Sequence, residues 1–528
     1  MLVYFVIVPI VIAVFLYLFP YERVARILAI TMQVGLLAAA LHLFYISRES
    51  DIVIFIGAYD DVLGIILRAD PLAAVFILLT AFIFLVVAIY SFSSHHSRLF
   101  WFLLFIWEGA LIGVFLAGDL FNIFVLTEVA TVAVSVLIMY NRNNRSMYDG
   151  IIYFMVNIVV IQFYLLGLGY LYRLTGVMDM GTAAVVLQMI DGRQLALPYA
   201  LIMTFIALKC AMLPLFSWLP KAHSTPGASP AVSAVLSGLH IKSGVYLFIR
   251  FQDLFEPIAA SGFFLVLGIA TAIFGVIMAL SQSDIKRILA YSTIAQVGLI
   301  VAGLSTGSIH NYIGSLYHSI NHALFKSALF LSAGMIAHTY NTRSISQIRG
   351  VFKHMPVVSF ASILAILGII GTPFFNGSIS KYFLMYDIDG PLNIVMMLIN
   401  LGTITIFIKY AAIFIGQPKP GLEPHENDDW KQVPIIFLGA LCLIFGVFGE
   451  YFMAYLFSWD VSISQDSYLE KSVIFAGSVI AGGLIYKYLL NGRRLLVRIS
   501  EVDLGFREMC AAMGLFFAIL LVAVGMFT

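Results

Sequence analysis

The chain has 528 residues, of which 62% are hydrophobic and only 11% are charged, and its formal net charge is +1. Soluble domains contain about 25% charged residues, so this composition excludes a soluble globular protein and indicates an integral membrane protein. The near-neutral charge argues against nucleic acid as a partner. The three cysteines lie in apolar runs without C-x-x-C spacing, which argues against disulfides, an iron–sulfur cluster or a zinc site.

Apolar runs of about 20 residues, the length that crosses a bilayer as a helix, follow one another along the chain. The first run lacks the basic start and the cleavage site of a signal peptide, so we count it as a span. The expected fold class is therefore an all-α polytopic membrane protein. We expect sixteen spans, near residues 2–19, 25–45, 70–93, 99–117, 119–140, 149–172, 197–219, 229–249, 258–281, 288–305, 310–338, 356–386, 391–415, 433–456, 472–490 and 508–527.

Lysine and arginine are concentrated in the odd-numbered loops between these spans. Because basic loops stay on the cytoplasmic side, we expect an N-terminus outside and a multi-pass protein of the cell (plasma) membrane. Lysine also occurs inside the expected spans. Lys487 lies near a cytoplasmic end and is expected to snorkel, but the other intramembrane lysines need a further explanation. These others are Lys209, Lys242, Lys326, Lys381 and Lys409.

Buried charges predict an ion or proton path. An ionisable residue at membrane depth costs about 2.5 kcal/mol or more on insertion scales, and such residues mark functional pathways. Glu128 follows Asp119 by nine residues and precedes Tyr140 by twelve, which places it near mid-membrane. A lysine can release and regain a proton when buried, whereas an arginine cannot. Structural ion pairs that only specify helix packing are the alternative interpretation.

Two expected spans contain helix-breaking residues beside a buried lysine. Pro214 follows Lys209 in "ALKCAMLPLFSWLP", and Pro373 precedes Lys381 in "GTPFFNGSISKYF". Proline removes a backbone donor, and interrupted helices at membrane depth often mark the ion site of a transporter. A lone proline is more often a packing kink. The two spans are the seventh and twelfth and run in opposite directions, as two inverted five-span repeats require.

Three polar residues, His318, His322 and Lys326, lie four residues apart in "YHSINHALFKSAL" and form one stripe on a helix. A metal site needs further ligands, which this span lacks, and Lys326 would repel a cation. Histidines that make only structural hydrogen bonds are a second interpretation. We favour a proton relay, because neutral imidazole both donates and accepts and titrates near neutrality.

Signatures of a self-powered enzyme are missing from the sequence. We find neither a phosphate-binding Gly-Lys loop nor a dinucleotide fingerprint after a strand. We therefore expect no catalytic centre of its own, no cofactor and no metal. The energy must come from an ion gradient or from a partner.

Five motifs in order resemble the antiporter-like subunits shared by respiratory complex I, Mrp-type cation/proton antiporters and membrane-bound energy-converting hydrogenases. They are "GDLFNIFVLTEV", "LKCAMLPLFSWLPKAHSTPGASPAVSAVLSGLHIKSGVYLFIR", "SDIKRILAYSTIAQVG", "HSINHALFKSALFLSAG" and "GTPFFNGSISK". The resemblance implies about 14 core helices plus about two C-terminal ones, with interrupted helices 7 and 12. The implied divisions are residues 1–95, a first repeat at 99–250 (helices 4–8), a second at 258–415 (helices 9–13), and 433–528.

The resemblance also implies a proton path. Glu128 and Lys209 look like its first charge pair, and Lys381 looks like its terminal lysine. Glu108 is either a second acid or a packing group, and Lys409 has no assigned role. The implied path runs through Glu128, Lys209, Lys242, His318, His322, Lys326 and Lys381.

Two departures favour an Mrp-like or hydrogenase-like subunit over the largest complex I subunit. Phe216 stands where many complex I relatives have a histidine, and Mrp-type members of the D class resemble this sequence more closely there. The link "NGRRLLVRISEVDLGFREM" is too short for a long lateral helix.

The expected function is that of a proton-translocating subunit in a multi-subunit ion-pumping complex. Its partners would be other membrane subunits, with redox subunits in a hydrogenase-like or complex I-like assembly, together with H+, Na+ at the level of the complex, and lipid. A stand-alone secondary cation/proton antiporter is one alternative. A structural membrane anchor for a redox arm is the other.

Overall fold

The computed structural model describes the chain except residues 19–21, 58–63, 95, 418–427, 461, 491–498, 501 and 528. Most of the basic part of the C-terminal link therefore lies outside the described residues. The chain divides into two compact units. Unit 1 comprises Met1–Ala228, Leu239–Phe263 and Leu504–Thr528, and unit 2 comprises Ser229–Gly238 and Phe264–Asp503.

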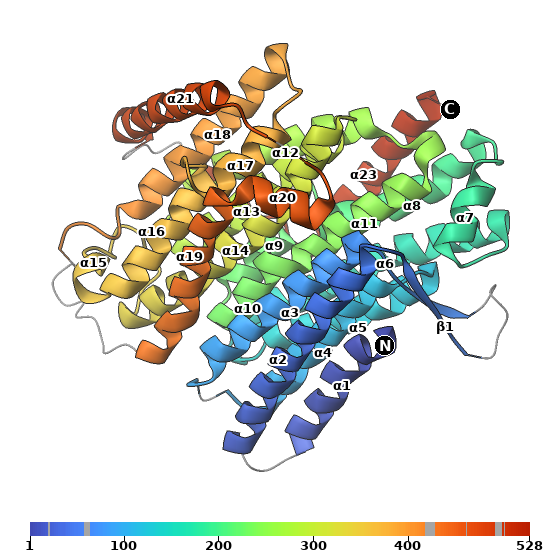
Figure 1. Cartoon of the computed structure of the whole chain (residues 1–528), viewed down its shortest axis with the longest axis horizontal. Coiled ribbons are helices and arrows are strands. Elements are labelled where there is room, and N and C mark those ends of the chain that lie inside the picture. The colour runs from blue at the N-terminus through green and yellow to red at the C-terminus, as the bar shows by residue number, and fades with distance from the viewer. Residues whose placement is uncertain are drawn as a thin grey trace. The chain divides into compact units, whose positions relative to one another are not determined.

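Unit 1 is built mainly from apolar helices that lie side by side, with α1 against α4, α4 against α5 and α5 against α6 (Figure 1). The last helix of the chain, α23, packs on α6 and α8. The elements are α1 (Leu2–Leu18), α2 (Glu22–Ser47), β1 (Ile52–Ile56), β2 (Ile65–Ala69), α3 (Pro71–Ser91), α4 (Arg98–Leu116), α5 (Leu120–Ile138), α6 (Asn144–Thr175), α7 (Met180–Leu187), α8 (Gly192–Lys209), α9 (Trp218–Ser224), α11 (Ile241–Leu254), a 3-10 turn (Glu256–Ile258) and α23 (Phe506–Phe527).

Unit 2 is organised around the long helix α14, which contacts α10, α13, α16, α17 and α19. The helix α21 packs against α18. The elements are α10 (Pro230–Val235), followed by a π-helical turn (Leu236–His240) that leads into α11, then α12 (Ser261–Ser281), α13 (Ile285–Leu304), α14 (Ile309–Thr339), α15 (Val351–His354), α16 (Pro356–Ile370), α17 (Asn376–Leu384), α18 (Gly390–Ala411), a 3-10 turn (Asp429–Lys431), α19 (Gln432–Val447), α20 (Gly449–Phe457), α21 (Gln465–Leu484) and a second π-helical turn (Ile485–Leu490).

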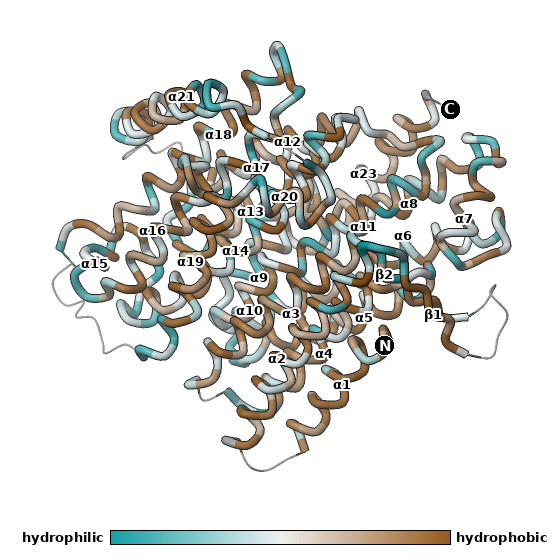
Figure 2. Tube along the Cα trace, in the orientation of Figure 1, coloured by the Kyte–Doolittle hydropathy of each residue, from teal (hydrophilic) through white to brown (hydrophobic). Residues whose placement is uncertain are grey.

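The prediction of an all-α polytopic membrane protein is confirmed at the level of fold class. Thirteen helical stretches among the described residues are long and apolar enough to cross a membrane, and α1 and α16 are shorter apolar helices. Hydrophobic residues predominate along the helices, whereas many of the hydrophilic residues lie at helix ends and in connections (Figure 2).

Helix α14, which carries the histidine stripe, and its neighbour α13 are almost completely buried although their hydropathy is low. The span in α14 has a mean hydropathy of only 1.2 yet is 94% buried, and that in α13 has 1.5 and is 89% buried. The more apolar span in α12, at 2.6, is only 44% buried. Polar residues are thus concentrated in the protein interior, where their partners can be other residues rather than lipid.

A β-hairpin is an addition to the predicted fold. Its strands β1 and β2 pair antiparallel, with Ile52 opposite Ala69 and Ile56 opposite Ile65. The Ile66 N–H donates to Asp119 Oδ2 at 3.2 Å, and Asp119 also caps α5 by accepting from the Asn122 N–H at 2.7 Å. The acid of the "GDLF" motif therefore fixes the start of the helix that carries Glu128.

Candidate functional site

Lys209 is the last residue of α8 and lies in a cluster of neutral oxygens in unit 1. The Lys209 side chain is 3% exposed, and its Nζ donates to Asn157 Oδ1 at 2.7 Å and to Thr131 Oγ1 at 3.2 Å. Asn157 belongs to α6 and Thr131 to α5. Three helices therefore converge on one ammonium group.

The chain leaves the helical path after Lys209 and resumes it at Trp218. Pro214 lies in this stretch and has no N–H to donate, and Ala211 has a positive φ of 50°. The last carbonyls of a helix need partners from elsewhere. The indole Nε1 of Trp218 donates to the Leu208 carbonyl at 2.8 Å, so the tryptophan of the "SWLP" motif holds the helix end that carries Lys209.

Trp218→Phe is predicted to destabilise this junction. The substitution keeps an aromatic ring but removes the indole N–H, which leaves the Leu208 carbonyl with the Ala211 N–H but without the tie to Trp218. The net contribution of one hydrogen bond is about 0.5–1.5 kcal/mol, so the midpoint of thermal unfolding in detergent should fall. Trp430→Phe is the matched control because Trp430 is 49% exposed. Equal midpoints for both variants would contradict the assigned role of Trp218.

Glu128 interacts with Lys209 through charge, without a hydrogen bond between them among those of the described residues. It lies on α5 less than one turn before Thr131, and it interacts electrostatically with Lys209. Its Oε1 atom is buried and has no hydrogen-bond partner among the described residues. The acid thus keeps an accepting position open beside the lysine.

A buried histidine that sequence analysis does not single out lies in the same unit. Trp107 Nε1 and His240 Nδ1 are 3.3 Å apart, and His240 Nε2 and the Tyr153 hydroxyl are 3.0 Å apart. His240 precedes Lys242 by two residues, and residues with this spacing do not share a helix face. Lys242 itself is completely buried on α11. The only sequence signal for His240 is that it places an imidazole beside Lys242 within an expected span.

The histidine stripe of unit 2 finds its partners on neighbouring helices. His318 Nε2 lies 2.9 Å from Gln296 Oε1 of α13, and its Nδ1 lies 2.9 Å from Ser380 Oγ of α17. His322 is completely buried on the same helix. Lys326 Nζ donates to the Leu289 carbonyl at 2.9 Å and also to Ser292 Oγ.

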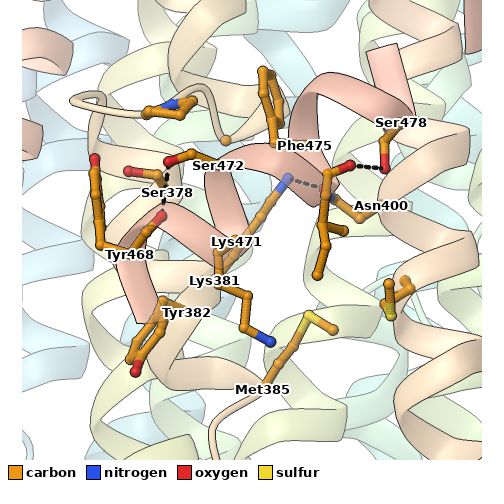
Figure 3. A pocket seen from close by; sticks show the side chains of 14 residues that line it. Ser378, Lys381, Tyr382, Met385, Asn400, Tyr468, Lys471, Ser472, Phe475 and Ser478 are labelled. Carbon is orange, nitrogen blue, oxygen red and sulfur yellow. Dashed lines mark hydrogen bonds between the residues drawn. The ribbon is translucent and has the colours of Figure 1, made fainter. Parts of the chain in front are cut away.

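Lys381 lies on α17, which follows α16 after a short non-helical stretch. Its Nζ donates to the Ile369 carbonyl, in the last turn of α16, at 2.7 Å and to Asn400 Oδ1 of α18 at 2.8 Å. The lysine therefore satisfies one of the carbonyls left free where α16 ends. A cavity of about 110 Å³ borders Lys381 and extends to Tyr468 and Lys471 of α21 (Figure 3). Helix α21 lies outside the segment that carries the recognised motifs, so its part in this cavity was not predicted.

The approach of α17 to α16 depends on a glycine. A Cβ on Gly377 would lie 1.9 Å from the Gly368 carbonyl oxygen, far inside contact distance. Gly377→Ala is therefore expected to lower the free energy of unfolding by about 1–3 kcal/mol through overpacking. Gly477→Ala on α21 is the control, because a Cβ there meets nothing within 4 Å. Thermal unfolding of both variants in detergent checks this prediction, and an unchanged midpoint for Gly377→Ala would contradict it.

The two unassigned candidates have different surroundings. Lys409 Nζ donates to the Leu280 carbonyl at 2.7 Å and to the Gln282 carbonyl at 2.5 Å, so it caps the C-terminal end of α12. Glu108 is completely buried on α4 and accepts a hydrogen bond from the Gln33 side-chain amide. A capping role accounts for Lys409, whereas Glu108 keeps both predicted interpretations.

The C-terminal segment returns to the break after α8. Ser217 Oγ donates to the Leu504 carbonyl at 3.0 Å, and Lys221 Nζ donates to the same oxygen. Lys221 is only 4% exposed, although the sequence places it in a loop. The segment just before α23 thus contacts the stretch that follows Lys209.

Comparisons with known proteins agree with the motifs. The family described as "NADH:quinone oxidoreductase/Mrp antiporter, TM" matches residues 117–409. NADH-quinone oxidoreductase subunit N of Desulforudis audaxviator is 32% identical over 426 residues, covering 75% of this chain and 84% of the relative. The Na(+)/H(+) antiporter D subunit of Alkalihalophilus pseudofirmus is 29% identical over 465 residues, covering 84% and 93%.

Solved structures show the same fold. A chain of the Mrp complex from Dietzia sp. matches with a TM-score of 0.80 and 22% identity, covering 90% of this chain and 99% of that one. A chain of the archaeal membrane-bound sulfane sulfur reductase matches with a TM-score of 0.79, also at 22% identity, covering 91% and 99%. A chain of Thermus thermophilus respiratory complex I matches with a TM-score of 0.76 at 21% identity, covering 91% and 100%. The resemblance predicted from the motifs is confirmed: the chain belongs to the NADH:quinone oxidoreductase/Mrp antiporter transmembrane family.

Proposed function

We propose that this chain is the proton-translocating, antiporter-like subunit of a multi-subunit membrane complex of the Mrp, complex I or energy-converting hydrogenase kind. The residues that carry protons are Glu128, Lys209, Lys242, His318, His322, Lys326 and Lys381. Sodium exchange would be a property of the whole complex.

The observation that carries the proposal is the chemistry around three buried lysines. Lys209 donates to an amide and a hydroxyl oxygen, Lys326 to a carbonyl and a hydroxyl, and Lys381 to a carbonyl and an amide. A lysine held by neutral oxygens can lose its proton without leaving a contacting buried carboxylate unpaired. A purely structural ion pair would instead place a carboxylate in contact with the ammonium.

We infer that α8 with α9, and α16 with α17, are the halves of two interrupted spans. In support, Lys209 is the last residue of α8, and Lys381 contacts a carbonyl at the end of α16. Interrupted helices supply such exposed carbonyls at ion sites in transporters. The two inverted repeats, the four divisions of the chain and the outside location of the N-terminus stay predictions from the sequence.

Multi-subunit assembly is inferred from the relatives, whose names place them in Mrp antiporters, a sulfane sulfur reductase and complex I. Gentle detergent extraction from native membranes, followed by mass spectrometry of the co-purifying proteins, tests this inference. Iron–sulfur or nickel–iron subunits would identify a redox-driven complex. Small membrane subunits alone would identify an Mrp-type antiporter.

Purification of the chain without partners would contradict the proposed assembly. It would favour the stand-alone cation/proton antiporter, which proteoliposomes containing this chain alone could then confirm by ion exchange. The structural-anchor alternative predicts that alanine at Lys209 or Lys381 impairs assembly before it impairs transport. The amount of assembled complex therefore has to be measured beside every transport rate.

A further inference from the structure

Three buried side chains of unit 1 form a hydrogen-bonded chain that the proposed proton path does not include. Trp107 of α4 contacts His240 Nδ1, and Tyr153 of α6 contacts His240 Nε2. The three side chains are 0%, 3% and 1% exposed for Trp107, His240 and Tyr153. The directions of the hydrogen bonds in this chain decide what it can contribute to a proton path.

The contacts fix the tautomer of the histidine. An indole N–H can only donate, so His240 Nδ1 must accept from Trp107 and carries no proton. The neutral ring then has its proton on Nε2, which donates to the Tyr153 oxygen. The hydroxyl proton of Tyr153 is consequently directed to a different acceptor.

Glu128 offers an open acceptor in the same unit. Tyr153 and Glu128 interact electrostatically, and the buried Oε1 of Glu128 has no hydrogen-bond partner among the described residues. Tyr153 also lies one turn before Asn157 on α6, and Asn157 holds Lys209. The same face of α6 therefore carries Tyr153, which interacts with Glu128, and Asn157, which accepts from Lys209.

We propose that Trp107, His240 and Tyr153 form a positioning chain that presents the Tyr153 hydroxyl to Glu128 through one water molecule, and so sets the pH at which Glu128 exchanges its proton. The inference rests on the proposed proton-translocating function. His240 is a positioning residue and not a proton carrier. Its Nδ1 accepts from the Trp107 indole, and an indole N–H cannot take up a proton in return.

Other titratable groups on helices that pack around α5 have separate partners. Lys209 of α8 donates to Asn157 and Thr131. Glu108 of α4 accepts from Gln33. The Tyr153 hydroxyl is thus the neutral donor whose removal changes the hydrogen bonding of Glu128 with the least change elsewhere.

The test is the pH profile of proton transport by membrane vesicles that contain the whole complex, measured with a dye that reports the pH gradient. Tyr153→Phe removes one oxygen and should move the acidic limb of the profile to higher pH. A carboxylate that loses a hydrogen-bond donor holds its proton more tightly, and the expected shift is about one pH unit. His240→Leu should produce the same shift although it does not touch Glu128.

Conservative variants separate positioning from packing. His240→Gln offers one amide that can accept from Trp107 and donate to Tyr153, so it should restore the wild-type profile. Tyr164→Phe, on the same helix, removes a hydroxyl that donates to the Leu120 carbonyl at 2.7 Å and should leave the profile in place. If the complex with His240→Leu fails to assemble, the profile of Tyr153→Phe tests the link to Glu128, because that variant keeps the aromatic ring of residue 153.

Two results would overturn the inference. An unshifted profile for Tyr153→Phe removes the link to Glu128, and a shift in Tyr153→Phe without one in His240→Leu removes the role of His240. Glu128→Gln serves as the reference for the proposed function. If Glu128→Gln transports normally, the proposed function itself is wrong, whereas loss of transport there with unshifted profiles elsewhere refutes only the positioning chain.

Discussion

Replacing Lys209 with alanine, or Glu128 with glutamine, reduces proton transport by vesicles to the level of membranes that lack the complex. The reason is that Lys209 is the group on which α5, α6 and α8 converge, and Glu128 is the acid that interacts with it. Loss of Lys209 removes the proposed proton carrier of this pair, and loss of Glu128 removes the opposite charge. Dye-based transport, normalised to the assembled complex, measures the effect.

Lys487→Ala is the control for the Lys209 variant. Lys487 is exposed in the π-helical turn that follows α21, so its loss should leave transport at the wild-type rate. Wild-type transport in Lys209→Ala would contradict the assignment of this lysine. A complex that fails to assemble in both the Lys209 and the Glu128 variants would favour the structural-anchor alternative.

The second large effect is expected at Lys381. Lys381→Ala should also abolish coupled transport, because this ammonium is 7% exposed, satisfies the Ile369 carbonyl and borders the cavity shown in Figure 3. The cavity of about 110 Å³ is large enough for several water molecules, and we expect such water to exchange protons with the lysine.

Lys471→Ala is the matched comparison, since it removes a lysine from the same cavity. Lys471 is exposed on α21, and solvent screens the charge of an exposed lysine. Its loss should therefore leave transport above about half the wild-type rate. The same vesicle assay compares the two variants. Equal loss in both would mean that the charge of the cavity as a whole, and not Lys381, is required.

Charge and hydropathy alone predict the fold class and single out the buried lysines. An intramembrane lysine is rare enough to be recognised without a partner, which is why Lys209 and Lys381 are visible in the sequence. The spacing of His318, His322 and Lys326 correctly predicts one helix, α14, because four-residue spacing is a local property.

The partners of these residues are not local. Asn157, Gln296 and Asn400 look like ordinary polar residues in the sequence, and only packing brings their oxygens to the lysines and histidines. His240 is missed because its function depends on Trp107 and Tyr153, which are distant in sequence.

Two further features escape prediction for different reasons. Each strand of the hairpin has only five residues, too few to show a period, and both are apolar apart from Arg68. Lys409 has no role assigned from the sequence, because hydropathy cannot show that its ammonium meets the carbonyl groups at the end of α12.

The most direct test of the central claim, that these lysines exchange protons and do not merely supply charge, is proton transport by arginine variants. Arginine keeps the positive charge but does not release its proton at working pH. The account predicts that Lys209→Arg, Lys326→Arg and Lys381→Arg complexes assemble yet transport no protons. Transport at the wild-type rate in these arginine variants would contradict it, because a fixed charge would then be sufficient.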